Sequence, residues 1–322
     1  MSPDARRLRT RAVMLVLVLL ALAAALAFMT LGARGRWDFI LPFRGAKLAG
    51  LVLVAYSIAV STVLFQTVTG NRILTPSIMG FDSLYVLIQT ALVFFLGAGR
   101  VSATNPQLLF VFEVAALVLF AGLLFRWLFS GSARSLHFLM LVGIIFGILF
   151  RSIASFLQRV IDPSEFLILQ DRLFASFNTI DTTLLAISGA AVAMVSIMAW
   201  RMLPVFDILA LGRENAIVLG VDHRRTVTFV LAMVTVLVAV STALVGPVTF
   251  FGLLVANLAY LLLPTARHAV LLPAAALIAV VSLVGGQVIL ERVFAFDTAL
   301  SIIIEFAGGI FFILLVVRGV AR

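Results

Sequence analysis

The stretch "LGRENAIVLGVDHRR", from Leu211 to Arg225, places several charged side chains between two long apolar runs. Gly212 and Gly220 divide it, and glycine commonly adopts the left-handed backbone conformation that ends a helix. The sequence therefore predicts that one helix ends at Gly212 and that a second, short helix ends at Gly220. A plain connecting loop between two apolar helices needs no such construction.

The short helix is predicted to be amphipathic. Arg213 and Glu214 stand in its first turn, where the helix dipole favours an acidic side chain. Ala216, Ile217 and Leu219 form an apolar face. A helix with this pattern fits either the groove of a partner protein or the interface of a lipid bilayer. The pattern favours partner docking only slightly over interfacial anchoring.

The overall composition indicates an integral membrane protein. Of the 322 residues, 63% are hydrophobic and 11% are charged, and the mean hydropathy is +1.23. A soluble domain is about one-quarter charged, so this chain could not cover its surface with polar groups in water. The formal net charge is +9, but the basic residues mostly stand at the ends of apolar runs. They are expected to set membrane topology, and no nucleic-acid partner is predicted.

Several kinds of chemistry find no support in the sequence. There is no cysteine, and His137, His223 and His268 are too far apart for metal-ligand spacing. Lys47 follows Ala46, whereas a phosphate-binding P-loop needs Gly-Lys-Ser/Thr. No clustered nucleophile or acid–base pair suggests a membrane enzyme. We expect no cofactor on this chain, and any ATP and Mg would be bound by a separate ATPase.

The apolar runs predict an all-α polytopic membrane protein with one transmembrane domain over residues 1–322. A membrane helix needs about 20 mostly apolar residues to cross a core of about 30 Å. The first run exceeds the 7–15 apolar residues of a typical signal peptide, so we expect it to be retained. The ten predicted spans are roughly 12–29, 48–68, 81–98, 107–128, 135–157, 183–203, 226–245, 250–263, 269–290 and 300–318.

The eighth span, 250–263, is short and follows Gly246-Pro247. It is expected to be a partial or re-entrant helix, which membranes tolerate only where it is buried in protein or lines a cavity.

Arginine and lysine residues are more frequent in the loops that share a side with the N-terminus. Such loops remain in the cytoplasm. The prediction is a multi-pass protein of the cytoplasmic (inner) membrane, with both termini and the segment 205–225 in the cytoplasm.

Two short patterns bear on packing. The segment "IAVSTVLF" (58–65) recurs as "VAVSTALV" (238–245), which suggests two related halves, spans 2–5 and 7–10, as in many transporters. Gly143 and Gly147 form a GxxxG pattern that lets helices approach closely.

Two carboxylates fall within predicted spans, Glu113 in the fourth and Glu305 in the tenth. Charges at such positions are costly and indicate a functional site by default. They support an alternative function, a proton-coupled secondary transporter that needs no ATPase. Asp82 stands at the start of a span, where the helix dipole favours it.

Four stretches together resemble the permease subunits of the iron–siderophore and cobalamin family of ATP-binding cassette (ABC) importers. The resemblance is carried, in the family's order, by "QTVTGNRILTPSIMG" (66–80), "LALGRENAIVLGVDHRR" (209–225), "GPVTFFGLLVANLAYLL" (246–262) and "SIIIEFAGGIFFILLVVRG" (301–319). The family's Asn-Pro is Asn71-Arg72 here, and its Pro-His is Ala256-Asn257. The combination of "TPSIMGFDSLY" (75–85), "GLLVANLAY" (252–260) and "GGQVILERVF" (285–294) is similar to the branch for anguibactin-, petrobactin- and catecholate-type ferric siderophores.

The resemblance implies a cobalamin-permease-like fold and a set of partners. They are a second permease subunit, which is the same or a paralogous chain, two cytoplasmic P-loop ATPases and an extracytoplasmic siderophore-binding protein. The residues that would contact an ATPase are Leu211, Gly212, Arg213, Glu214, Ala216, Leu219 and Gly220. Those that would form the gate and translocation path are Asn71, Ile73, Pro76, Gly246, Pro247 and Asn257.

The resemblance also implies that Arg44, Lys47 and Arg292 meet acidic patches of the binding protein. Without it, these residues read as interfacial anchors that extend to the lipid headgroups. Lysine at position 47 replaces the family's usual arginine, which removes the bidentate geometry toward carboxylates.

Overall fold

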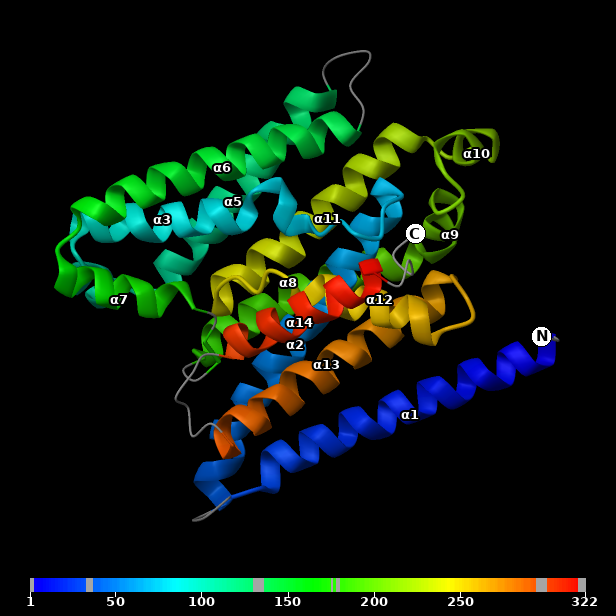
Figure 1. Ribbon diagram of the computed structural model, residues 1–322, viewed down its shortest axis with the longest axis horizontal. Helices are drawn as coiled ribbons and strands as arrows, with labels where there is room; N and C mark the ends of the chain where they lie inside the picture. The colour runs from blue at the N-terminus through cyan, green and yellow to red at the C-terminus, as the bar shows by residue number, and fades with distance from the viewer. Residues whose placement is uncertain are drawn as a thin grey trace.

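The computed structural model describes residues 3–32, 37–129, 136–174, 176–177, 180–293 and 300–317. Within these ranges the regular structure is entirely helical. Most of the long helices run side by side across the view of Figure 1.

Ten helices coincide with the ten predicted apolar spans, usually to within a few residues. Seven of them are long and apolar enough to cross a membrane, and α3, α12 and α14 are shorter apolar helices. The ten are α1 (Pro3–Thr30), α2 (Trp37–Thr69), α3 (Phe81–Leu96), α5 (Pro106–Phe129), α6 (Leu136–Val160), α8 (Thr182–Arg201), α11 (His223–Val245), α12 (Phe251–Leu262), α13 (His268–Arg292) and α14 (Leu300–Val317).

Five short elements connect these spans: η1 (Pro76–Met79), α4 (Ala98–Ala103), α7 (Pro163–Leu173), α9 (Leu203–Leu209) and α10 (Arg213–Val218). Helix α7 was not predicted, although the sequence holds its start signal. Asp162 caps it by accepting a hydrogen bond from Ser164 N at 2.9 Å, and Pro163 occupies the first turn. The hydrogen bonds from Ser164 lower the pKa of Asp162 from its ordinary value.

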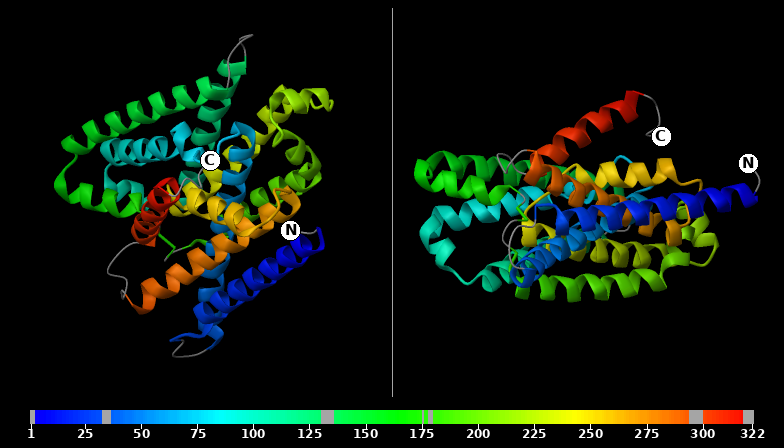
Figure 2. Two further views of the ribbon diagram at one scale, coloured as in Figure 1. Left: turned by 45° about the vertical axis from the view of Figure 1, so that its right-hand side comes forward. Right: turned by 90° about the horizontal axis from the view of Figure 1, so that it is seen from below.

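Helices α2 and α11 form the centre of the bundle. They pack against each other, and α2 also contacts α12 and α13, whereas α11 also contacts α5 and α8. Helix α1 lies at the periphery against α13, and α3 pairs with α6 (Figures 1 and 2). The buried side chains of α2 and α11 therefore form the core through which the other helices are connected.

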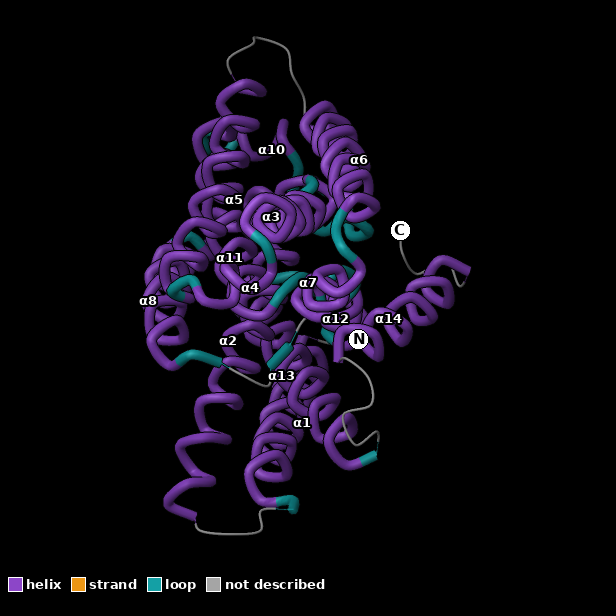
Figure 3. The backbone as a smooth tube through the Cα atoms, turned by 90° about the vertical axis from the view of Figure 1, so that its left-hand side faces the viewer, coloured by secondary structure: helices purple, strands orange, loops and turns teal. Residues whose placement is uncertain are grey.

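Different elements lie at the two ends of the bundle. The N-terminus, α9 and α10 lie at one end in Figure 1, and α7 and the start of α2 lie at the other. Figure 3 views the molecule from the second of these ends. We call them the α10 end and the α7 end.

The backbone is not α-helical at two places, residues 70–80, which contain the 3₁₀ helix η1, and residues 246–250. After the second, α12 has only 12 residues, about 18 Å at 1.5 Å per residue. It is buried against α2, α13 and α14. The prediction of a partial helix enclosed by protein is confirmed.

The GxxxG pattern is a packing site, as predicted. Gly143 and Gly147 bring α6 against the backbone of Met79 and Gly80, at the end of η1. A Cβ atom at position 143 would lie 2.7 Å from Met79 Cα, which is too close for a real contact. The two glycines thereby fix where the 70–80 segment meets α6.

Gly143→Ala should destabilise the protein, because backbone atoms would have to move to admit the methyl group. Overpacking of this kind costs about 1–3 kcal/mol. Gly122→Ala on α5 is the matched control, since its Cβ atom would meet nothing within 4 Å. Thermal unfolding in detergent should show a lower midpoint for Gly143→Ala than for Gly122→Ala. Equal midpoints would mean that α6 and η1 are not in close contact.

Candidate coupling and translocation sites

Helix α10 lies between Gly212 and Gly220, as the sequence predicted. Gly212 precedes it with φ 92°, and Gly220 follows it with φ 85°. Val221 N donates to Ala216 O and Gly220 N donates to Ile217 O, both at 3.0 Å. This pair of bonds is the Schellman motif, which satisfies the last carbonyl groups of a helix. The segment is therefore a defined surface feature rather than a loose loop.

The outer face of α10 is apolar and exposed. Val218 is 86% exposed, and Leu211, Ile217 and Leu219 are each more than half exposed. Arg213 and Glu214 flank this surface and are also exposed. We call these six residues the α10 surface.

The structure differs from the sequence-based expectation at Ala216, which is fully buried. Because α10 packs against α9 and α11, Ala216 holds the helix on the bundle and cannot itself reach a partner. Val218 takes the exposed position instead, and the sequence analysis had not selected it.

A hydrogen-bonded chain leads from α9, next to α10, into the centre of the bundle. Asp207 Oδ1 on α9 lies 2.8 Å from His268 N and 2.7 Å from His268 Nδ1. On the other side of the ring, His268 Nε2 lies 2.7 Å from Thr67 Oγ1 on α2. The Nδ1 proton of the ring is donated to Asp207, and the Thr67 hydroxyl also lies 2.8 Å from Val63 O, to which it donates. The buried His268 ring thus joins α9, α13 and α2.

The same chain reaches the turn after α2. The Tyr260 side chain interacts with Thr67, and the Arg72 guanidinium lies 4.5 Å from the centre of the Tyr260 ring. The Arg72 carbonyl accepts hydrogen bonds from Gln66 Nε2 at 2.7 Å and Asn257 Nδ2 at 3.2 Å. We call the connected side chains of Asp207, His268, Thr67, Tyr260 and Arg72 the relay.

The two departures from the family motif therefore meet in space, since Asn257 binds the carbonyl group of Arg72. Asn71 shapes the same turn, because its Oδ1 atom accepts from Ile73 N at 2.9 Å. The Ile73 side chain is 41% exposed.

The other predicted gate residues lie apart from this turn. Pro76 opens η1, and Gly246 ends α11 with φ 98°. Both line a small internal cavity, and Pro247 lies beside it in the non-helical segment. The structure thus divides the predicted gate into two groups, one at the Arg72 turn and one at the cavity.

The three predicted docking cations converge at the α7 end. Arg44, Lys47 and Arg292 line one cavity of about 230 Å³. Arg44 Nη1 donates to Phe28 O at 2.7 Å and to Leu31 O at 2.9 Å. Arg292 also donates to Leu31 O and is exposed. Both arginines bind the carbonyl groups at the end of α1, where the helix dipole favours cations.

Lys47 differs from the expectation for a docking residue. Its Nζ atom pairs with Glu291 Oε1 at 3.0 Å, and both side chains are about nine-tenths buried. Gln287 Nε2 donates to the same oxygen atom at 3.0 Å. Glu291 was not predicted, although it immediately precedes Arg292 in the sequence. The pair joins α2 to α13, so Lys47 contributes to the stability of this end.

The two intramembrane carboxylates have separate environments. Glu113 is buried and accepts a hydrogen bond from Gln89 Nε2 on α3 at 2.7 Å. The Gln89 amide on α3 is therefore a partner of Glu113 across two helices. Glu305 is half-buried on α14, which packs against α12 and α13.

Within the described ranges, no three His, Cys, Asp or Glu side chains are grouped as they would be around a transition-metal ion. The His137 side chain lies outside the described residues.

Among the described residues, seven long apolar helices and a short apolar helix at the core indicate a multi-pass membrane protein. A model of the FecCD transport family matches residues 12–318. The chain belongs to this family.

Relatives and a solved structure agree with the assignment. The chain is 48% identical to the petrobactin import system permease protein YclO of Bacillus subtilis, over 88% of this chain and 90% of that protein. It is 37% identical to the petrobactin import system permease protein FatC of Bacillus anthracis, over 85% and 78%. The fold matches a chain of an ABC transporter described as the metal-chelate type, in an inward-facing conformation. That match has a TM-score of 0.84 and 22% identity, over 96% and 99% of the two chains. These relatives are transport subunits and not enzymes.

Proposed function

We propose that this chain is the permease subunit of an ATP-driven importer that moves a ferric siderophore across the cytoplasmic membrane. A separate subunit hydrolyses ATP, with Mg bound there. The observation that carries the proposal is the α10 surface, an exposed apolar face on a short helix held rigidly by two left-handed glycines. An exposed apolar face of this kind is typical of a helix that binds in a groove of a partner protein.

The substrate class rests on the relatives. Two of them, at 48% and 37% identity, are petrobactin import permeases. A catecholate-type ferric siderophore such as ferric petrobactin is therefore the proposed cargo.

The proposed assembly contains two permease subunits, two cytoplasmic ATPases and an extracytoplasmic binding protein. The α10 end faces the cytoplasm, and the α7 end faces the binding protein. Arg292 and Arg44 at the α7 end supply the cations that meet acidic patches of that protein. Lys47 supports them through its pair with Glu291.

The relay gives the proposed mechanism a mechanical path. Movement of α10 by an ATPase displaces α9, and Asp207 transmits that displacement through His268 to α2. The Arg72 turn follows, because Gln66 of α2 holds its carbonyl group. A rigid chain of short hydrogen bonds can carry such a shift, because packed cores adopt discrete arrangements rather than deforming continuously.

Growth on ferric petrobactin as the iron source tests the proposed cargo. A strain that lacks this chain should fail to grow, and the parent gene should restore growth. Growth on a simple iron salt at high concentration is the control, which should be unaffected. Unchanged growth of the deletion strain on ferric petrobactin would contradict the assigned cargo.

His268→Phe should uncouple ATP hydrolysis from transport, because the phenyl ring fills the space but makes neither hydrogen bond. A hydrogen bond to a charged group contributes about 1.5–3 kcal/mol, so transport should fall about tenfold or more. Uptake and ATPase rates should be measured on the same preparation. His223→Phe, which changes a histidine outside the relay, is the control. A parallel loss of both rates would show that His268 only supports folding.

A further inference from the structure

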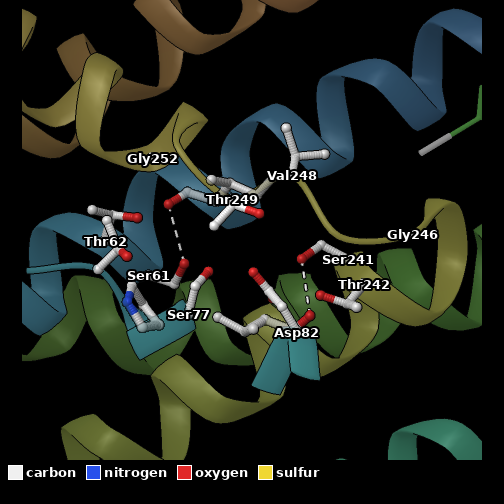
Figure 4. Close-up of a pocket in the computed structure, with 14 residues that line it drawn as sticks. Ser61, Thr62, Ser77, Asp82, Ser241, Thr242, Gly246, Val248, Thr249 and Gly252 are labelled. Atoms are coloured by element: carbon white, nitrogen blue, oxygen red, sulfur yellow. Dashed lines mark hydrogen bonds between the residues drawn. The ribbon is translucent and has the colours of Figure 1, made fainter. Parts of the chain in front are cut away.

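The internal cavity beside Pro76 and Gly246 is lined by side chains that the transport mechanism has not used. It encloses about 20 Å³, which is room for one water-sized particle. Its polar wall consists of Ser61, Thr62, Thr75, Ser77, Asp82, Ser241, Thr242 and Thr249. Figure 4 shows most of these side chains surrounding one space.

Both copies of the repeated segment contribute to this wall. Ser61 and Thr62 of α2 correspond in the repeat to Ser241 and Thr242 of α11. Both Ser-Thr pairs line the same cavity. The duplication seen in the sequence therefore corresponds to a single place in the structure, between the two central helices.

The cavity offers hydrogen-bond acceptors. Ser61 Oγ donates its proton to Ile58 O at 3.1 Å, and Ser241 Oγ donates to Val238 O at 3.0 Å. These two hydroxyl oxygens thus keep lone pairs free, and they do so in the same way in each repeat. Asp82 is 92% buried, since its exposed fraction is 8%. The Ser77 and Thr249 side chains hydrogen-bond to its carboxyl group, whereas within the described residues nothing hydrogen-bonds to its buried Oδ2 atom.

One side of the cavity is closely packed. A Cβ atom at Gly252 would collide with Thr62 Oγ1, so only glycine allows α12 to approach this hydroxyl. The two segments that are not α-helical, 70–80 and 246–250, also end at the cavity. Transporters commonly place ion sites between repeats, at interrupted helices.

We propose that this cavity binds one dehydrated monovalent cation of the size of Na⁺. Hydroxyl and carboxylate oxygens are the ligands that hard cations prefer. One carboxylate balances one positive charge, whereas a divalent ion would leave an unpaired charge in the interior. The charges of Glu305 and Arg151 act on Asp82 with opposite signs. This binding does not depend on the identity of the transported cargo.

Binding of radioactive Na⁺ to the purified chain in detergent tests the proposal. The parent should show one saturable site that choline does not displace. Asp82→Asn should lower the affinity about tenfold or more, because the neutral amide removes the charge that balances the ion. Glu113→Gln is the control, because Glu113 is a buried carboxylate on α5 that does not line the cavity. It should bind Na⁺ as the parent does.

Stability provides a second readout that separates ion binding from folding. At equal ionic strength, NaCl should raise the unfolding temperature of the parent above its value in choline chloride, and Asp82→Asn should lose this difference. If Asp82→Asn does not fold, Ser61→Ala and Ser241→Ala each should raise the half-saturating Na⁺ concentration. The absence of saturable Na⁺ binding by the parent would overturn the proposal. Unchanged binding by Asp82→Asn, or by both Ser61→Ala and Ser241→Ala, would also overturn it.

Discussion

Val218→Asp should abolish the association of this chain with its ATPase and reduce siderophore uptake to background. Val218 is the most exposed apolar residue of the α10 surface, at 86%. An aspartate there would place a charge in the apolar groove of the partner. Loss of a central interface residue commonly costs 2 kcal/mol or more, about 30-fold in affinity. Leu219→Asp, combined with Glu214→Arg, should have the same effect.

Affinity purification in mild detergent, followed by protein identification, measures this association. Val293→Asp is the control, because Val293 is also an exposed apolar residue, at 71%, and follows α13 at the α7 end. The parent and Val293→Asp should both retain a P-loop ATPase. Retention of the ATPase by Val218→Asp would show that α10 is not the docking site.

Lys47→Met should cause the largest loss of stability among single charge removals at the α7 end. It would leave the Glu291 carboxylate buried without its cation, although Gln287 still donates to it. Removing one partner of a buried pair costs about 3–5 kcal/mol, whereas replacing both with apolar side chains is often neutral. The double variant Lys47→Met, Glu291→Met should therefore recover most of the loss.

Unfolding in detergent across the two single variants and the double variant measures the interaction energy of the pair. Arg100→Met on α4 is the control, because Arg100 is exposed and should change stability by less than about 0.5 kcal/mol. Additive effects of Lys47→Met and Glu291→Met would contradict a paired role for Lys47.

The positions of the spanning helices and of α10 could be predicted from the sequence, because they depend on neighbouring residues. Apolar runs of about 20 residues located the spans, because a membrane helix must satisfy its backbone within one segment. Gly212 and Gly220 located α10, because left-handed glycines end helices through local hydrogen bonds. The side of α10 that faces the bundle could not be predicted, since a six-residue helix has too few positions to show a periodic face.

Contacts between segments far apart in the sequence could not be predicted from these local patterns. His268 is separated from Asp207 by 61 positions and from Thr67 by 201, and Arg72 from Asn257 by 185. From the sequence, His268 was considered only as a metal ligand, and its spacing from the other histidines argued against that role. A buried polar side chain needs a partner, but hydropathy alone does not show on which helix that partner lies. The repeated Ser-Thr pair did hold a usable signal, because both copies line the same cavity.

The most direct test of the account is uptake into proteoliposomes that contain the purified importer, with ATP inside and the binding protein loaded with radioactive ferric petrobactin outside. The account predicts uptake that requires hydrolysable ATP and that is lost with Val218→Asp. Uptake driven by a proton gradient without ATP, and abolished by Glu113→Gln or Glu305→Gln, would contradict it and would favour a proton-coupled carrier.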